Sequence, residues 1–391
     1  MDYLDLLYDD LLSQGIAHPD WMLGAMAGAL TAFFVQLYYW LGRYGGLPRF
    51  RNNRGIRPQI PSPPVSVVVV IRENGYYFIE NYLPLLLGQR YDEFEVVAVD
   101  CSYDEEIGEL LHEKSLACSR LHVTAIKQQR SAGHGTKLAL TVGIKACAYE
   151  HIVFTTTDCY PSSDKWLSLM AKGFINGDIV IGYCGIEPGK GFANRLMRCS
   201  RLAGSVRWLS AATRGRAYRG IAGNIGYTKS LYFESRGFNY LNMEIGDDDL
   251  FIQKIATSDN VSVVMNPAAT MRQVPFGGLG WWRAVRRFYA YSFRYYPARV
   301  KRSVRTELSS RLLFFALSAT AALLLPPPLI AVPLSLVLIR LLLELKIRRI
   351  GRRVGERGLA WAYILHDFWA PVGEFALALG NRIRPNRKIW R

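Results

Sequence analysis

An aspartate stands directly after two of the apolar runs in this sequence, at the place where a strand would end. Asp158 closes the segment Phe154-Thr155-Thr156-Thr157-Asp158, and Asp100 follows Val97-Ala98-Val99. One carboxylate, phosphate oxygens and water are a common ligand set for Mg²⁺, so Asp158 is a candidate metal ligand. Asp100 is a candidate acceptor for a nucleobase imide or a ribose hydroxyl. The alternative for Asp100 is structural, because aspartate also begins turns and caps helices.

A glycine-containing segment, Gly133-His134-Gly135-Thr136-Lys137, opens an expected helix. Helix N-termini offer free amide donors and a partial positive charge, which suit phosphate groups. The spacing is not that of a P-loop. Lys137 is therefore a candidate ligand for a diphosphate, and a solvent-exposed lysine at a helix start is the alternative.

Three aspartates, Asp247, Asp248 and Asp249, are adjacent in the chain. Because their charges repel one another, they need a metal, basic partners or a raised pKa. A raised pKa is what a catalytic general base uses at neutral pH. The triplet is therefore a candidate source of a base, and an exposed helix N-terminus, where acids are favoured, is the alternative.

These side chains can act together only if a sheet gathers them. Apolar runs alternate with helix-like segments, which predicts an α/β fold with a mostly parallel sheet and right-handed crossovers. Ligands bind beyond the carboxyl ends of the strands in such sheets. The predicted strands are Val65–Ile71, Phe94–Val99, Leu121–Ile126, His151–Thr155 and Asp178–Gly182, and the predicted helices are Tyr76–Leu87, Ile107–Cys118, Lys137–Tyr149 and Lys165–Phe174.

From Val65 to Tyr291 the sequence resembles glycosyltransferase family 2, the inverting, membrane-associated transferases with a Rossmann-like nucleotide-sugar fold of the A type. The resemblance implies a nucleoside contact at Asp100 and a donor contact at Lys137. The family's Asp-x-Asp element resembles Thr156-Thr157-Asp158, so Thr156 replaces the first acid. The implied donor-binding residues at this element are Thr156 and Asp158, with Asp158 as the metal ligand.

The family's base-bearing motif resembles Gly246 to Leu250, which implies Asp248 as the base, with Asp247 as the second choice. The acceptor-side loop resembles Gly220 to Tyr227. A further family element, Gln-x-x-Arg-Trp, is typical of processive synthases. Its positions correspond to Ala284, Arg287 and Phe288, so the arginine alone is retained. Arg287, or its neighbour Arg286, is the implied contact to the diphosphate.

Two apolar regions predict membrane segments. Residues 21–41 carry no charge, end in aromatic residues and have the length of a membrane crossing. Acids before this segment and arginines after it place the following domain in the cytosol. The second region contains Pro326, Pro327 and Pro328, which predicts two short crossings joined at the prolines. This hairpin would return the basic residues 346–357 to the cytosol.

The predicted organisation has seven parts. They are an extracytoplasmic segment (1–20), a transmembrane helix (21–42), a basic, proline-rich linker (43–64), a cytosolic transferase domain (65–280), amphipathic interface helices (281–310), a transmembrane hairpin (311–345) and a basic, interfacial C-terminal region (346–391). A buried soluble bundle is the alternative for the apolar segments.

Composition supports a membrane surface as a partner. The net charge is +16, and half of the 48 Lys and Arg residues lie in four short stretches beside apolar runs. Such flanks favour anionic lipid over nucleic acid. The six cysteines show no pairing pattern or metal-ligand spacing, which is typical of a reducing cytosol.

The sequence therefore predicts a metal-dependent inverting glycosyltransferase of the bacterial inner membrane, multi-pass, with a cytosolic catalytic domain. The expected cofactor is Mg²⁺ or Mn²⁺, and the expected donor is a UDP- or GDP-sugar. The expected acceptor is a lipid-linked or polysaccharide glycan of the cell surface, and no nucleic-acid partner is expected. The alternatives are a catalytically silent scaffold, a processive synthase and a nucleic-acid-binding membrane protein. The sugar and the oligomeric state stay open.

Overall fold

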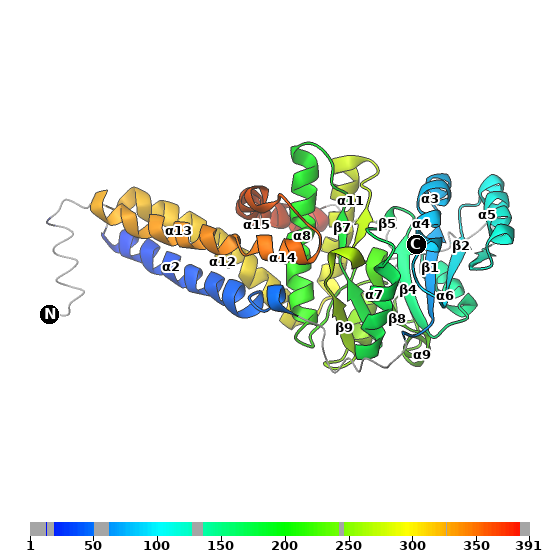
Figure 1. Ribbon diagram of the computed structural model, residues 1–391. Helices are drawn as coiled ribbons and strands as arrows, with labels where there is room; N and C mark the ends of the chain where they lie inside the picture. The colour runs from blue at the N-terminus through cyan, green and yellow to red at the C-terminus, as the bar shows by residue number, and fades with distance from the viewer. Residues whose placement is uncertain are drawn as a thin grey trace.

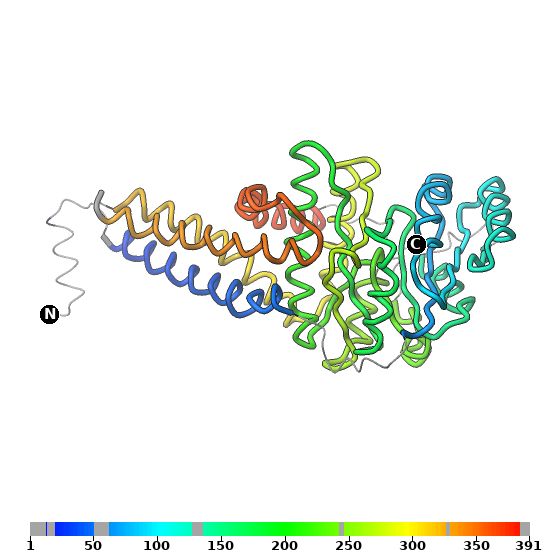
Figure 2. Tube along the Cα trace, in the orientation of Figure 1, coloured from blue at the N-terminus to red at the C-terminus, as the bar shows by residue number. Residues whose placement is uncertain are grey.

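The computed structural model describes residues 13, 19–50, 62–126, 136–241, 246–325 and 327–383 of the 391-residue chain. The candidate segment 133–135 lies outside these residues. An α/β domain forms one end of the molecule, and long helices project from it (Figure 1). The Cα trace in Figure 2 shows these helices running side by side away from the domain.

The main sheet has seven strands within the described residues, in the order β3-β2-β1-β4-β8-β6-β9. β1 pairs in parallel with β2 and β4, and β8 is antiparallel to β4 and β6. All five predicted runs are strands, so the predicted α/β fold with a mostly parallel sheet is confirmed. The strands are β1 (Val65–Ile71), β2 (Phe94–Asp100), β3 (Leu121–Ala125), β4 (His151–Thr156), β6 (Ile179–Gly182), β8 (Ile225–Thr228) and β9 (Val261–Val264).

The interior strands β1 and β2 are buried on both faces because most of their residues are apolar. Helix α6 (Thr136–Ala146) packs closely on them at Gly143. A Cβ at this position would lie 2.8 Å from Cγ1 of Val68 and 2.9 Å from Cγ2 of Val99, so any side chain would push the helix away. The other helices of the domain are α3 (Gly75–Asn81), α4 (Leu83–Leu87), α5 (Glu105–Ala117), α7 (Trp166–Gly173), α8 (Phe192–Ala212), α9 (Lys229–Glu234) and α10 (Leu250–Ile255).

A second sheet of three short strands lies beside the main one in the described chain. Its central strand, β10 (Met271–Gln273), is antiparallel to β5 (Cys159–Pro161) and parallel to β7 (Cys184–Ile186). This pairing joins segments that are distant in sequence. It brings the end of β10 next to the turn that follows β4.

The projecting helices are α2 (Pro19–Leu37), which continues as a π-helix over Tyr38–Arg43, α12 (Ala298–Leu324) and α13 (Ala331–Glu344). Two described helical segments, Asp20–Arg49 and Ala298–Leu324, are long and apolar enough to cross a membrane by length and composition. The predicted boundary at residues 310 and 311 falls inside α12. The expected interface region is therefore divided between α11 (Gly278–Ser292) and the first turns of α12.

Buried polar side chains join the projecting helices to α15 (Ala360–Ile383). The guanidinium of Arg340 on α13 donates to Asp367 Oδ2 at 2.9 Å and to Gln36 Oε1 at 3.0 Å. Arg311 on α12 forms an ion pair with the same aspartate. Because buried charges are costly without partners, these contacts fix how the four helices pack. Within the C-terminal region predicted to be interfacial, residues 360–383 form one continuous helix, α15.

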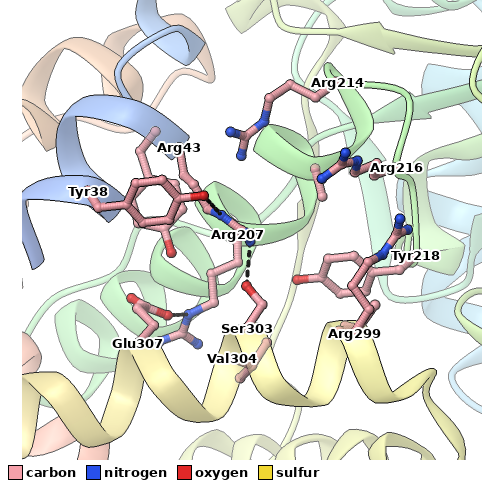
Figure 3. Close-up of a pocket in the computed structure, with 13 residues that line it drawn as sticks. Tyr38, Arg43, Arg207, Arg214, Arg216, Tyr218, Arg299, Ser303, Val304 and Glu307 are labelled. Carbon is pink, nitrogen blue, oxygen red and sulfur yellow. Dashed lines mark hydrogen bonds and ion pairs between the residues drawn. The ribbon is translucent and has the colours of Figure 1, made fainter. Parts of the chain in front are cut away.

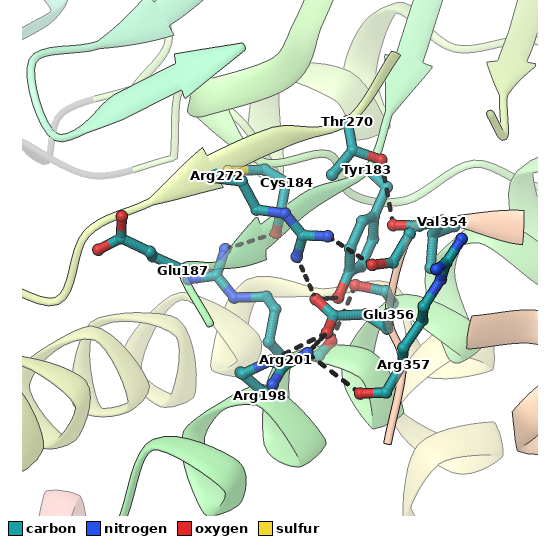
Figure 4. Close-up of polar contacts among 12 residues, drawn as sticks. Tyr183, Cys184, Glu187, Arg198, Arg201, Thr270, Arg272, Val354, Glu356 and Arg357 are labelled. Atoms are coloured by element: carbon teal, nitrogen blue, oxygen red, sulfur yellow. Dashed lines mark hydrogen bonds and ion pairs between the residues drawn. The ribbon is translucent and has the colours of Figure 1, made fainter. Parts of the chain in front are cut away.

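Glu356 anchors the C-terminal region to the α/β domain (Figure 4). It follows α14 (Ile347–Arg353), and its side chain is fully buried. Oε2 accepts from Arg198 Nη2 at 2.6 Å, and Oε1 accepts from Arg272 Nη1 at 2.6 Å and from the hydroxyl of Tyr183 at 3.1 Å. One carboxylate therefore compensates two buried guanidinium groups.

We expect Glu356→Gln to lower the free energy of unfolding by about 3–5 kcal/mol, because it leaves two buried arginines without their counter-charge. Equilibrium unfolding of the full chain in detergent measures this change. Asp164→Asn is the matched control, since its ion pair with Arg90 is exposed and should change stability by less than about 1 kcal/mol. Equal losses in the two variants would contradict the anchoring role.

Candidate active site

A cavity of about 470 Å³ opens at the carboxyl ends of β1 and β4. This volume lies in the range of small-molecule sites. The adjacent strands β1 and β4 bring the residues that follow them to one edge, and α11 covers that edge. The lining residues include Arg72, Glu73, Asn74, Thr156, Thr157, Asp158, Ala222, Asp247, Asp248, Gln273, Phe276, Trp281 and Val285.

Asp158 is held at the end of β4 by neutral donors. The hydroxyl of Thr156 donates to Oδ1 at 2.6 Å, and Nε2 of Gln273 donates to Oδ2 at 2.9 Å. Gln273 is itself oriented by Arg201 Nη2, which donates to its Oε1 at 2.7 Å. Oδ1 also accepts from Sγ of Cys159 at 3.6 Å. Oδ2 accepts from Gln273 alone among the described residues, so this oxygen keeps acceptor capacity. Thr156 thus orients the acid that follows and adds no charge.

The donor set around Asp158 fits a cation that binds together with phosphate. The described residues contain no cluster of three or more His, Cys, Asp or Glu side chains placed to hold a metal by themselves. Mg²⁺ usually takes one or two carboxylates and fills its remaining positions with phosphate oxygens and water. A single oriented carboxylate in an open cavity agrees with this pattern.

The turn after β1 lines the cavity beside the turn after β4. Asn74 has a left-handed backbone with φ of 58°, and the hydroxyl of Thr157 donates to the carbonyl of Glu73 at 3.0 Å. This contact fixes the β1 turn against the β4 turn. Arg72 therefore contributes a cation to the same cavity as Asp158.

The structure separates the roles of the three adjacent acids. Asp249 is fully buried and accepts from the amide of Leu250 at 2.6 Å, the hydroxyl of Ser292 at 2.5 Å and the hydroxyl of Tyr296 at 2.7 Å. These contacts tie α10 to α11 and to the start of the bundle. Asp249 is a structural residue, whereas Asp247 and Asp248 line the cavity.

Asp248 has the contacts expected of a base. Its Oδ2 accepts from the hydroxyl of Tyr289 at 2.5 Å and from the amide of Ala222 at 3.2 Å. Its Oδ1 is buried and has no hydrogen-bond partner among the described residues. Burial is the main cause that raises its pKa, and the charges of Asp247 and Asp249 add to the effect, while Arg219 and the Tyr289 hydrogen bond oppose it.

Burial also raises the pKa of Asp247, and the charge of Lys137 opposes this shift. Of the two lining acids, Asp248 alone has an oriented hydrogen-bonded oxygen and a second buried oxygen without a partner in the described chain. It is therefore the better placed of the two to take a proton from a bound hydroxyl.

We expect the rate to rise with pH over a range above that of an ordinary aspartate, because Asp248 must be deprotonated to act and burial favours its neutral form. Tyr289→Phe removes a hydrogen bond that stabilises the carboxylate, so the pKa of Asp248 should rise. The rising limb should then move to higher pH by about one unit. A pH–rate profile of each form measures this, and an unmoved or lowered limb would contradict it.

Four of the residues singled out from sequence lie together in the cavity, namely Thr156, Asp158, Asp247 and Asp248. Asp100 is not among the lining residues. Its Oδ1 accepts from the amide and the hydroxyl of Ser102 at 2.9 and 2.7 Å, which is the turn-forming alternative. The contacts of Oδ1 are local, and the nucleoside contact at Asp100 stays a prediction.

Lys137 and Arg287 are also outside the cavity lining. The ammonium of Lys137 donates to the carbonyl of Leu241 at 2.8 Å, on the segment that leads to the acidic triplet. Arg287 is exposed on α11, on a different face from Trp281 and Val285. The neighbouring Arg286, which was the alternative diphosphate contact, pairs with Glu374 at 3.0 Å.

Sequence reasoning missed Arg72, Gln273 and Tyr289. Arg72 could have been found, because it directly follows a predicted strand. Tyr289 shares a helix face with Trp281 and Val285 at four-residue spacing, and this pattern was an available signal. Gln273 carried no signal in the sequence, because its strand has only three residues and its partner Asp158 is distant in sequence.

The sequence matches no known protein-family model and no curated protein. Among solved structures, the chain is similar to a mannosyltransferase from Pyrobaculum calidifontis in complex with GDP-Man and Mn²⁺. The TM-score is 0.59 at 15% sequence identity, over 93% of this chain and 99% of that chain. This coverage extends beyond the α/β domain, so the likeness in fold includes the helical part.

Two further neighbours have lower scores. TarS of S. aureus, residues 1–349, aligns over 82% of this chain and 91% of its own with a TM-score of 0.40 at 17% identity. GalNAc-T7, bound to UDP, GalNAc and Mn²⁺, aligns over 54% of this chain and 44% of its own with a TM-score of 0.41 at 13% identity. Scores this low do not establish a shared fold.

Proposed function

We propose that the chain is a metal-dependent glycosyltransferase, which moves a sugar from a nucleotide diphosphate donor to an acceptor hydroxyl. One observation carries the proposal. A single cavity at the carboxyl edge of an α/β sheet is lined by an oriented carboxylate, Asp158, and by a buried acid with a raised pKa, Asp248. The first is suited to a cation bound with diphosphate, and the second to a general base.

The reaction we propose is a single displacement at the anomeric carbon. The acceptor oxygen forms a bond to this carbon, the bond from the carbon to the diphosphate oxygen breaks, and the acceptor proton passes to Asp248. One displacement inverts the anomeric configuration. Asp158 would hold Mg²⁺ or Mn²⁺, and the bound cation supplies positive charge for the leaving diphosphate. Arg72, at the same edge, is placed to add charge on that side.

The donor we propose is a UDP- or GDP-sugar. The fold neighbour is a mannosyltransferase bound to GDP-Man and Mn²⁺, which supports this class of donor and cation. Membership of glycosyltransferase family 2 is part of the proposal. The cavity volume admits a ligand of nucleotide-sugar size, with α11 as its cover.

The acceptor we propose is lipid-linked or a glycan at the inner face of the bacterial inner membrane, in the synthesis of cell-surface glycans. Two helical segments have membrane length and composition. The side chains of α15 that face outward are large and apolar, and Trp361, Trp369 and Phe375 are 72%, 66% and 73% exposed. Such a face is typical of a helix that lies in a membrane interface.

The test is nucleotide release from a panel of UDP- and GDP-sugars by the purified full chain in detergent, with Mn²⁺ or Mg²⁺ and with a chelator. We expect release from one donor, dependent on metal and stimulated by a membrane lipid extract that supplies acceptor. Neither binding nor release across the panel would contradict the proposal and favour the catalytically silent scaffold.

A further inference from the structure

A second, strongly cationic pocket lies where the projecting helices join the α/β domain (Figure 3). Its walls come from the π-helical end of α2, the C-terminal end of α8 with the loop that follows, and the first turns of α12. It shares no lining residue with the candidate active site. The arginines that line it are Arg43, Arg207, Arg214, Arg216 and Arg299.

The charge of this pocket is not balanced by acids among the described residues. Among the described lining residues, Glu307 is the one carboxylate, and Arg207 Nε donates to it at 2.6 Å. Arg311, from outside the pocket, forms a second ion pair with the same glutamate. The four remaining arginines of the pocket have no ion pair with an acid in the part of the chain that the structure describes.

The arginines are close enough to repel one another. Partial burial and then the charge of Arg43 lower the pKa of Arg214, with a further contribution from Arg216. Where positively charged side chains repel one another, a bound anion stabilises their charged forms. An anion in this pocket would relieve that repulsion.

Neutral groups orient two of these guanidinium groups. Arg43 donates to the hydroxyls of Tyr38 and Ser303, and Arg214 Nε donates to the carbonyl of Ser210 at 3.0 Å. Arg216 and Arg299 also line the pocket, and their side chains are exposed to solvent (Figure 3). Each guanidinium carries five N–H donors in a planar fork, so donors stay available for a phosphate.

The size of the pocket limits what can enter it. Its volume is about 90 Å³, well below the range of sites that enclose a whole small molecule. A phosphate-sized group can enter while the remainder of its molecule stays outside. Arginine is the side chain best suited to phosphate, since it can form two parallel hydrogen bonds.

The position of the pocket indicates where such a group comes from. Tyr38 and Arg43 stand at the domain-facing end of α2, and Arg299 and Ser303 stand in the polar first turns of α12. These are the two helices with membrane length, so a bilayer around them would present its headgroups at this level. We propose that this pocket binds a phosphate group, that of an anionic lipid headgroup, at the junction of bundle and domain.

The proposal does not depend on sugar transfer, so a failure of one leaves the other standing. The test uses the full chain purified in a nonionic detergent and titrated by calorimetry with three probes. These are dihexanoyl phosphatidic acid, dihexanoyl phosphatidylcholine and inorganic phosphate. The pocket variant carries Arg214→Gln, Arg216→Gln and Arg299→Gln. The control variant loses the same charge from exposed arginines outside the pocket, through Arg302→Gln, Arg305→Gln and Arg349→Gln.

We expect phosphatidic acid to bind more tightly than phosphatidylcholine, and its affinity to fall by about tenfold or more in the pocket variant and by less than about twofold in the control. Inorganic phosphate that binds as tightly as the lipid, with the same loss in the pocket variant, would retain the phosphate site and overturn the lipid as its source. Equal losses in both variants, or no loss, would overturn the site. If the triple variant does not melt as the wild type does, Arg216→Gln alone is measured, and a several-fold loss is expected.

Discussion

Asp248→Asn should reduce kcat by about 10²–10⁴-fold and leave KM for the donor nearly unchanged, because general-base catalysis contributes a factor of this size and the residue takes no part in holding the nucleotide. The substitution keeps the shape of the side chain and the acceptor for the Tyr289 hydroxyl, but an amide cannot take a proton. Steady-state nucleotide release at saturating donor measures kcat, and titration of the donor measures KM.

The matched control is Asp249→Asn, one residue further along. Asp249 accepts from Ser292 and Tyr296 through Oδ2 and from an amide through Oδ1. An asparagine there replaces one accepting oxygen with an NH₂ group and so loses at least one of these hydrogen bonds. The free energy of unfolding should fall by about 1–3 kcal/mol, whereas kcat of the folded protein should change little. A large loss of kcat in folded Asp249→Asn, with near-normal kcat in Asp248→Asn, would move the base away from Asp248.

Asp158→Ala should reduce turnover by about 10²–10³-fold, since a metal that neutralises a leaving diphosphate is worth several kcal/mol in the transition state. Excess Mn²⁺ should restore only part of the rate, because the carboxylate that positions the ion is missing. The measurement is nucleotide release over a range of metal concentrations, for which wild type should saturate at lower metal.

Gln273→Leu is the companion variant. It leaves Asp158 in place but removes the hydrogen bond to Oδ2, so the loss should be about tenfold and the metal requirement should persist. An Asp158→Ala protein that melts normally and turns over at the wild-type rate would exclude Asp158 from metal binding.

The sequence was informative about the fold where segments are long and apolar. The strand Val65–Ile71 was predicted with its correct bounds because it is a continuous run of mostly β-branched residues, which is typical of a strand buried on both faces. The strands of the second sheet have three residues each, which is too short for any periodicity. They could be seen only after the tertiary fold had paired β10 with β5 and β7.

The sequence predicted some residues of the candidate site because they stand next to predicted secondary-structure elements. Asp158 follows β4, so the edge rule for parallel sheets applies to it directly. Asp247 and Asp248 precede α10 and follow no described strand, so they were found from the repulsion of adjacent acids and from the family resemblance. Asp100 satisfies the same rule, and its Oδ1 accepts from Ser102 next to it. A sequence does not show such a local hydrogen bond, and the nucleoside contact at Asp100 stays a prediction. Arg287 was assigned by correspondence with a family motif, whereas the helix presents Tyr289 toward Asp248.

Metal-dependent binding of a nucleotide diphosphate at Asp158 is tested most directly by calorimetry. GDP and UDP are titrated into the detergent-purified full chain with Mn²⁺ and with a chelator. We expect one nucleotide to bind, chelation to weaken its binding by about tenfold or more, and Asp158→Ala to weaken its binding in Mn²⁺ by a similar factor. Binding that is equally tight with chelator and in Asp158→Ala, or no binding of either nucleotide, would contradict the account.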